Sequence, residues 1–121
     1  MTGLHETARR LRVLLAHLAR HPDLPEVSRA GTTHNPDLEI AVDGDTTAEF
    51  LSWCATFDHP KVRVGTYQSR GAVLLWGHGF IRGDAVRISA HVTDLPELGE
   101  WPEPMPLIGF RHVLTNSGWR S

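Results

Sequence analysis

Hydrophobic and polar residues alternate along residues 61–93, and two short turn signals divide this stretch into three runs. The first signal is 68–71 (QSRG) and the second is 82–85 (RGDA). Alternation with a period of two is typical of strands with one buried face, and Gly-containing turns between such runs indicate consecutive hairpins. The pattern therefore predicts a three-stranded antiparallel meander.

The turn positions also predict which residues lie opposite each other. A loop of two or four residues at the first turn places Val64 opposite Leu75, and the same rule centred on Gly83-Asp84 places Gly77 opposite Ala90. Both pairings produce one uniformly apolar face, which we expect to be the core face. It consists of Val62, Val64, Thr66, Val73, Leu75, Ile81, Val86, Ile88, Ala90 and Val92.

The second face of the meander is basic and aromatic. We expect Trp76 on the middle strand between Arg63 and His91, with Phe80 beside Arg87. No residue of this face is a carboxylate. The face consists of Lys61, Arg63, Tyr67, Leu74, Trp76, His78, Phe80, Arg82, Arg87, Ser89 and His91.

Two further stretches have helical periodicity. Residues 3–20 carry apolar side chains at spacings of three and four, which predicts an amphipathic helix. A second helix is predicted at residues 46–57, and Thr46 and Glu49 form a capping box at its start. Residues 38–43 alternate and predict a first strand, whereas 21–37 is rich in Pro, Gly and Thr and predicts a long irregular connection.

These elements predict an α+β fold. A crossover through the second helix places the first strand parallel to the second, and both helices cover the apolar face. The expected architecture is a two-layer sandwich with two helices on one face of a four-stranded mixed sheet, in the order α-β-α-β-β-β. Residues 1–94 form this single domain. Residues 95–121 form a Pro-rich extension that packs on the domain or on a partner, with a short edge strand at 107–114.

Composition narrows the function classes only slightly. The chain has 121 residues and a formal net charge of -2, so any attraction to nucleic acid must come from a local patch. The lone Cys54 excludes an internal disulfide. No continuous apolar run resembles a signal peptide or a membrane span. We therefore expect a soluble cytoplasmic protein that does not bind membranes.

No sequence motif identifies a catalytic site, and we expect no cofactor. On the predicted register, His78 and His91 lie one diagonal step apart, where two imidazoles can bind a metal or exchange a proton, but no third ligand accompanies them. His17 and His21 have the helical spacing of a metal-binding pair and also lack a third ligand. We therefore expect no metal site. Cys54 falls on a buried helical stripe and is expected to be a core thiol.

The basic and aromatic face is the best candidate for a binding surface. In one interpretation its aromatic residues stack on bases while its arginines meet phosphates. In the other, the C-terminal segment or a second subunit covers it, because a large apolar patch is rarely left exposed. The candidate partner-binding residues are Arg63, Tyr67, Trp76, His78, Phe80, Arg87 and His91.

Parts of the chain resemble a group of small proteins from actinobacteria and their phages and plasmids. The resemblance rests on HPDLP at 21–25, on the helix that ends before KVRV at 61–64, and on VLLWGHGFIRGDAVRISAHV at 73–92. It spans roughly residues 8–93. It implies no catalytic residues, because no activity is assigned to the group.

Three functions follow as hypotheses. The first is a non-enzymatic protein-interaction or accessory module that binds a partner protein or forms a homodimer. The second is a nucleic-acid-binding module that uses the basic and aromatic face. The third is a metal-dependent enzyme built around His78 and His91.

Overall fold

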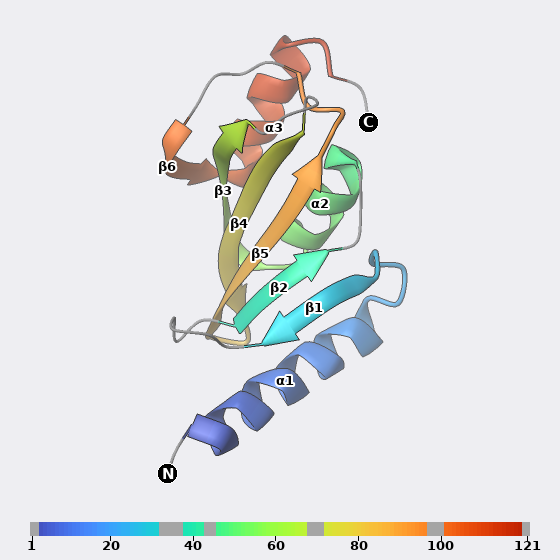
Figure 1. The fold of residues 1–121 in the computed structure, drawn as a ribbon, viewed down its shortest axis with the longest axis vertical. Helices are drawn as coiled ribbons and strands as arrows, with labels where there is room; N and C mark the ends of the chain where they lie inside the picture. Colours follow the sequence, from blue (N-terminus) through green and yellow to red (C-terminus); the bar gives the residue numbers. More distant parts are fainter. Residues whose placement is uncertain (1–2, 32–37, 43–45, 68–71, 97–100, 120–121) are drawn as a thin grey trace.

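The computed structural model describes residues 3–31, 38–42, 46–67, 72–96 and 101–119, and in this part the chain forms an α+β fold of three helices and six strands (Figure 1). The predicted fold class is confirmed, although the sheet and the helical layer are larger than predicted. In chain order the elements are α1 (Gly3–Arg20), β1 (Val27–Gly31), β2 (Leu38–Val42), α2 (Thr47–Cys54), β3 (Asp58–Tyr67), β4 (Val73–Ile81), β5 (Asp84–Val92), β6 (Trp101–Pro106) and α3 (Leu107–Asn116).

The six strands form one open mixed sheet in the order β1-β2-β5-β4-β3-β6. The pair β2–β5 is parallel and every other neighbouring pair is antiparallel. The predicted four-stranded mixed sheet is thus its centre. The first predicted strand pairs with β5 instead of β3, so two strands separate it from the strand that follows α2.

Both edge strands lie where no strand was expected. β1 falls inside the stretch predicted to be irregular, and β6 falls inside the Pro-rich segment. Proline cannot donate to a strand ladder and is therefore confined to edges. β6 is consistent with this rule, because it contains three prolines and pairs only with β3. The two edge strands extend the sheet without altering the central meander.

The C-terminal residues 107–114 were predicted to be a strand, and that prediction is wrong, since they lie in helix α3. Leu107, Phe110 and Leu114 are buried at spacings of three and four, which is the period of a helix face. A short apolar run of this kind does not distinguish a strand from a helix by periodicity alone. α3 therefore contributes to the core instead of forming an edge.

The core lies between the helices and the apolar face of the sheet. The predicted apolar face is confirmed: all of its residues are buried except Thr66, whose side chain lies outside the described part. Trp53 and Phe50 of α2 and Phe110 of α3 pack against it with 0–1% exposure. Gly77 makes this packing possible, because a Cβ there would lie 2.6 Å from Cys54 Sγ.

The register of the first hairpin is confirmed near its centre, and that of the second is shifted. Val64 lies opposite Leu75, as predicted. In the second hairpin Gly77 lies opposite Ile88 instead of Ala90, because Arg82 and Gly83 form the two-residue turn, with φ of 51° and 84°. Positive φ at both positions is typical of the type I′ hairpin turn. A shift of two residues keeps every side chain on its predicted face but changes its neighbours.

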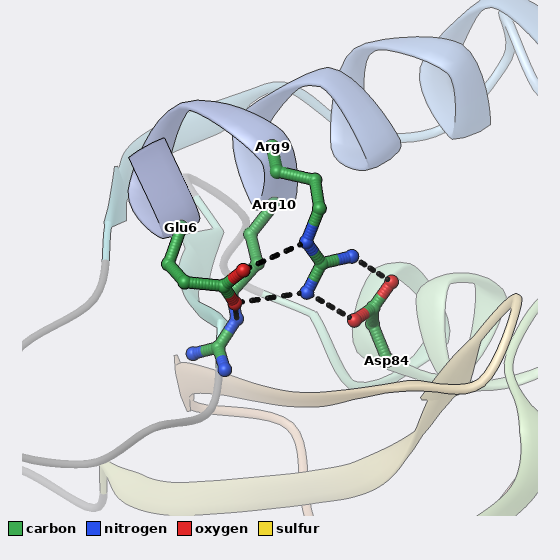
Figure 2. A network of polar contacts seen from close by, with 4 residues as sticks. All are labelled: Glu6, Arg9, Arg10 and Asp84. Atoms are coloured by element: carbon green, nitrogen blue, oxygen red, sulfur yellow. Dashed lines mark hydrogen bonds and ion pairs between the residues drawn. The ribbon is translucent and has the colours of Figure 1, made fainter. Parts of the chain in front are cut away.

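Helix α1 is anchored at two places. Figure 2 shows Arg9 between Glu6 and Asp84, where its Nη1 and Nη2 donate to the two carboxylate oxygens of Asp84 over 2.9 and 2.8 Å. This pairing lowers the pKa of Asp84. Further along, buried His17 contacts Thr56 through a 2.7 Å hydrogen bond. The described helices include none that is long and apolar enough to cross a membrane.

Helix α2 begins with the predicted cap and with a contact that the sequence did not indicate. Thr46 Oγ1 accepts from the backbone N–H of Glu49 over 3.2 Å. Asp94, at the end of β5, accepts from both the backbone N–H and the hydroxyl of Thr47 over 2.8 and 2.7 Å. Negative charge is favoured at a helix N-terminus, which makes this contact stabilising. The two hydrogen bonds join the start of α2 to the segment that follows β5.

Candidate binding surface

The second face of the sheet bears no helix in the described part of the chain. In Figure 1, α2 and α3 lie behind the sheet, and the near face of β3, β4 and β5 is bare. Residues 101–119 extend the sheet at β3 and pack on the core side, so they do not cover Trp76. We call this surface the open face. Its described side chains are Glu39, Lys61, Arg63, Leu74, Trp76, His78, Phe80, Arg87, Ser89 and His91.

The corrected register arranges these side chains in rows across the strands. One row runs from Lys61 on β3 through His78 and Arg87 to Glu39 on β2. In the next row Trp76 lies between Arg63 and Ser89. The prediction that His91 is its neighbour is therefore wrong. Residues in one row have Cβ atoms about 5 Å apart, close enough for direct interaction.

A second predicted neighbour also changes with the register. Phe80 lies opposite Ala85 instead of Arg87. Phe80 keeps 42% of its surface exposed. It therefore forms an exposed apolar rim near the β4–β5 turn.

Trp76 is half-buried and is flanked by two guanidinium groups. The Cζ atom of Arg87 lies 5.0 Å from the ring centroid, and that of Arg63 lies 5.8 Å away. These are cation–π distances. The Nε atoms of both arginines are buried, and no hydrogen-bond partner for them is present among the described residues. A base that stacks on the Trp76 ring would compete with these guanidinium groups for contact with the ring.

Strand β2 brings to the open face a carboxylate that the meander alone did not predict. Glu39 on β2 accepts a hydrogen bond and ion pair from Arg87 Nη2. Asp84 is engaged with Arg9 of α1, whereas exposed Asp58, at the start of β3, lies opposite Phe80 at the end of the face. Among the described residues, the three cations Lys61, Arg63 and Arg87 outnumber Glu39 and Asp58, so the centre of the surface is positive in a chain whose formal net charge is -2.

The proposed pairing of His78 with His91 is wrong. His78 lies opposite Arg87, and His91 lies opposite Leu74, four residues further along the ladder. At the rise of a strand this separates the two imidazoles by about 13 Å, too far to share one metal ion. The described residues contain no group of three or more His, Cys, Asp or Glu side chains arranged to hold a metal.

The remaining candidate groups of the sequence belong to the core. Thr56 Oγ1 donates to the Trp53 carbonyl, so it must accept from His17 Nε2, which is therefore the protonated nitrogen of the neutral ring. Burial lowers the pKa of His17 to about 4. Cys54 is fully buried, and burial raises the pKa of its thiol, as expected of an inert core residue.

A hollow of about 490 Å³ opens at the end of the open face near the β4–β5 turn. His59 and Lys61 come from the start of β3, where a bulge interrupts the ladder, and His78 and Phe80 come from β4. His59 has a left-handed backbone with φ of 52°. The described lining residues include no carboxylate and are His59, Lys61, His78, Gly79, Phe80, Ala85 and Val86.

Of the seven predicted binding residues, the structure brings five into one continuous group and leaves one apart, and the side chain of the seventh is not described. Arg63, Trp76, His78, Phe80 and Arg87 share adjacent rows, whereas exposed His91 lies toward the other end of β5. The backbone of Tyr67 ends β3, but its side chain lies outside the described residues. Sequence reasoning missed His59, because no local pattern indicates the left-handed backbone at His59 or the bulge beside it.

Comparisons with known proteins add no functional assignment to this surface. No family model, curated protein or solved structure matches the chain.

Proposed function

We propose that this protein is a non-enzymatic interaction module whose open face binds a partner protein with an acidic surface. The observation that carries the proposal is Trp76, half-buried between Arg63 and Arg87 on a face that no described segment covers. Tryptophan and arginine are the residue types that most often dominate the energy of protein interfaces. Here the two types occur together at the centre of the sheet.

The charge of the face favours an acidic partner over a second copy of this chain. A two-fold dimer through the open face would place Lys61, Arg63 and Arg87 near the same three cations of the other copy, and the described carboxylates Glu39 and Asp58 are fewer than these cations. Like charges brought together in an interface oppose association. An acidic protein surface instead supplies the missing counter-charges while burying Trp76.

A nucleic-acid-binding module is the second candidate, and the excess of cations on the open face is the observation that favours it. The surroundings of Trp76 argue against this candidate, because single-strand binders stack bases on an accessible ring face. The flanking arginines occupy the space near that ring. We therefore rank a protein partner first.

Photo-crosslinking from the open face tests the proposal. A photoreactive amino acid replaces His91, which is exposed at the rim of the face, and in a matched control it replaces exposed Ser117 at the end of α3. In cells that express the chain naturally, we expect one protein to crosslink from position 91 and not from position 117. The Trp76→Glu substitution should abolish that crosslink.

Mass spectrometry of the crosslinked product then separates the alternatives. A different protein with acidic residues at the crosslinked surface supports the proposal. A crosslink to a second copy of the chain, or to RNA or DNA, contradicts it in favour of a homodimer or of the second candidate. Equal crosslinking from positions 91 and 117, or none from position 91, also contradicts it.

A further inference from the structure

From the hollow at the end of the open face we infer a nucleotide-binding site, in which the phosphate lies against Lys61 and His59 and the base lies against Phe80. This inference goes beyond the proposed partner surface, because it assigns a compact ligand to a separate part of the same face. The hollow has a volume of about 490 Å³, within the range of pockets that hold small organic ligands. Its position beside the β4–β5 turn separates it from the Trp76 row.

The charge of the lining selects an anion. Lys61, His59 and His78 line the hollow from two neighbouring strands, and none of its described lining residues is Asp or Glu, although exposed Asp58 lies opposite Phe80 in the ladder. Arg87 lies opposite His78 in the ladder, which adds a further cation next to the hollow. The nearest carboxylate of that row, Glu39, is engaged with Arg87. One lysine and two imidazoles at the same hollow can supply N–H donors to a phosphate, and Lys61 adds a positive charge.

The backbone at His59 is the second observation. A left-handed φ at a residue other than glycine is uncommon, and such residues cluster at binding sites. A bulge between Asp58 and Lys61 accompanies it, and bulges redirect side chains. The two irregularities together bring the side chain of His59 to the hollow beside Lys61.

The apolar part of the lining indicates that the anion carries a planar group. Phe80 is 42% exposed, and Ala85, its partner in the ladder, continues the apolar wall. Aromatic side chains stack on nucleobases whatever the base. A phosphate linked to a base matches both halves of the hollow. Such a group occurs in a free mononucleotide and also in a unit of single-stranded nucleic acid.

Titration of the isotopically labelled full chain with adenosine 5′-monophosphate, followed by NMR, tests the inference. We expect the amide signals of 59, 61, 78–80 and 85–86 to shift, with adenosine alone and inorganic phosphate alone each binding about tenfold more weakly or worse. Phosphate that binds as tightly as the nucleotide would overturn the inference, as would shifts confined to the Trp76 row or no shift at all.

Matched variants then assign the two halves of the site. Lys61→Ala should weaken binding of the mononucleotide about tenfold, the loss of one charge-assisted contact, while Lys61→Arg retains most of the affinity. Phe80→Ala should weaken the mononucleotide and adenosine but not phosphate. Arg12→Ala, which removes an exposed cation from α1, is the control and should change nothing. Equal losses in Lys61→Ala and the control contradict the assignment.

A five-nucleotide oligoadenylate distinguishes the two sources of the ligand. If it binds much more tightly than the mononucleotide and still depends on Lys61, the site takes a unit of a single strand. If the affinities are equal, it takes a free nucleotide, and either result supports the inference. An oligonucleotide that binds independently of Lys61 and Phe80 contradicts it. Crosslinking from position 91 is a separate readout, so failure of this site and failure of the proposed partner surface can be told apart.

Discussion

Arg87 and Trp76 form the central contact of the open face, with 5.0 Å between the guanidinium carbon of Arg87 and the centroid of the Trp76 ring. The same guanidinium donates to Glu39 on β2. One cation therefore interacts with a ring on β4 and with a carboxylate on β2, and it joins the parallel strand pair to the meander. Arg63 contacts the ring from β3, and the described residues show no ion pair for it.

The first prediction concerns these two arginines. Arg87→Gln removes both a cation–π contact and a partly buried ion pair, so we expect it to lower the free energy of unfolding by about 1–2 kcal/mol. Arg63→Gln removes only the cation–π contact and should cost about 0.5–1 kcal/mol. Urea unfolding measures both, with Arg12→Gln on the exposed side of α1 as the control. A larger loss in Arg63→Gln than in Arg87→Gln would show that Glu39 contributes nothing.

The second prediction concerns the closest packing in the core. A Cβ at Gly77 would lie 2.6 Å from both Cys54 Sγ and Ile88 Cγ2, so Gly77→Ala forces α2 away from the sheet. Overpacking of this kind costs about 1–3 kcal/mol. Gly31→Ala is the matched control, because nothing lies within 4 Å of its added Cβ. Thermal unfolding should separate the two variants clearly, and similar melting temperatures would contradict the described packing.

The third prediction tests whether α3 folds as part of the same unit as the meander. Phe110 is fully buried, so Phe110→Ala should destabilise the whole chain by about 3–5 kcal/mol in a single cooperative transition. Ile108, on the exposed side of the same helix with 81% exposure, should tolerate alanine with a change below about 0.5 kcal/mol. If Phe110→Ala melts α3 alone and leaves the main transition unchanged, the C-terminal segment is an independent unit.

The fourth prediction follows from buried His17, whose pKa is lowered to about 4 from an ordinary value of 6.5 by burial, assisted by the nearby charges of His21 and Arg20. The unfolded chain therefore binds a proton at a higher pH than the folded chain does. Stability from this group is complete above pH 6.5 and declines as the pH falls toward 4, by at most about 3 kcal/mol.

Urea unfolding at several pH values between 7 and 4 measures this decline. His17→Gln is the informative comparison, because its amide can still donate to Thr56 but does not titrate. The difference in unfolding free energy between wild type and variant should shrink as the pH falls through this range. Parallel curves would show that His17 is not the group responsible.

The central meander and α1 could be predicted because their evidence is local. Alternation with a period of two assigned Val64, Leu75 and Ile88 to the buried face, and a three- and four-residue spacing located α1 at the residues where the structure has it. The basic and aromatic character of the open face followed from the same alternation. Neither inference needed to know which strands are neighbours.

The neighbours themselves depended on tertiary structure. Arg82-Gly83 and Gly83-Asp84 are both plausible hairpin turns, and both leave every side chain on the same face, so the pattern could not choose between them. The choice moved His91 away from His78 and Trp76 and placed Arg87 beside the ring. The observed register therefore excludes His78 and His91 as a metal-binding pair. It also forms the cation–π contact between Arg87 and Trp76.

Local periodicity was sufficient to assign the buried face of the meander and the basic face opposite it, because side chains alternate along a single strand. Only the tertiary structure decided that β1 and β6 extend the sheet, that α3 enters the core, and that Glu39 and His59 join the open face. These features arise from pairing between segments distant in the chain and from backbone geometry at a bulge. Neither the pairing nor the backbone geometry can be predicted from local composition, because contacts between elements stabilise both.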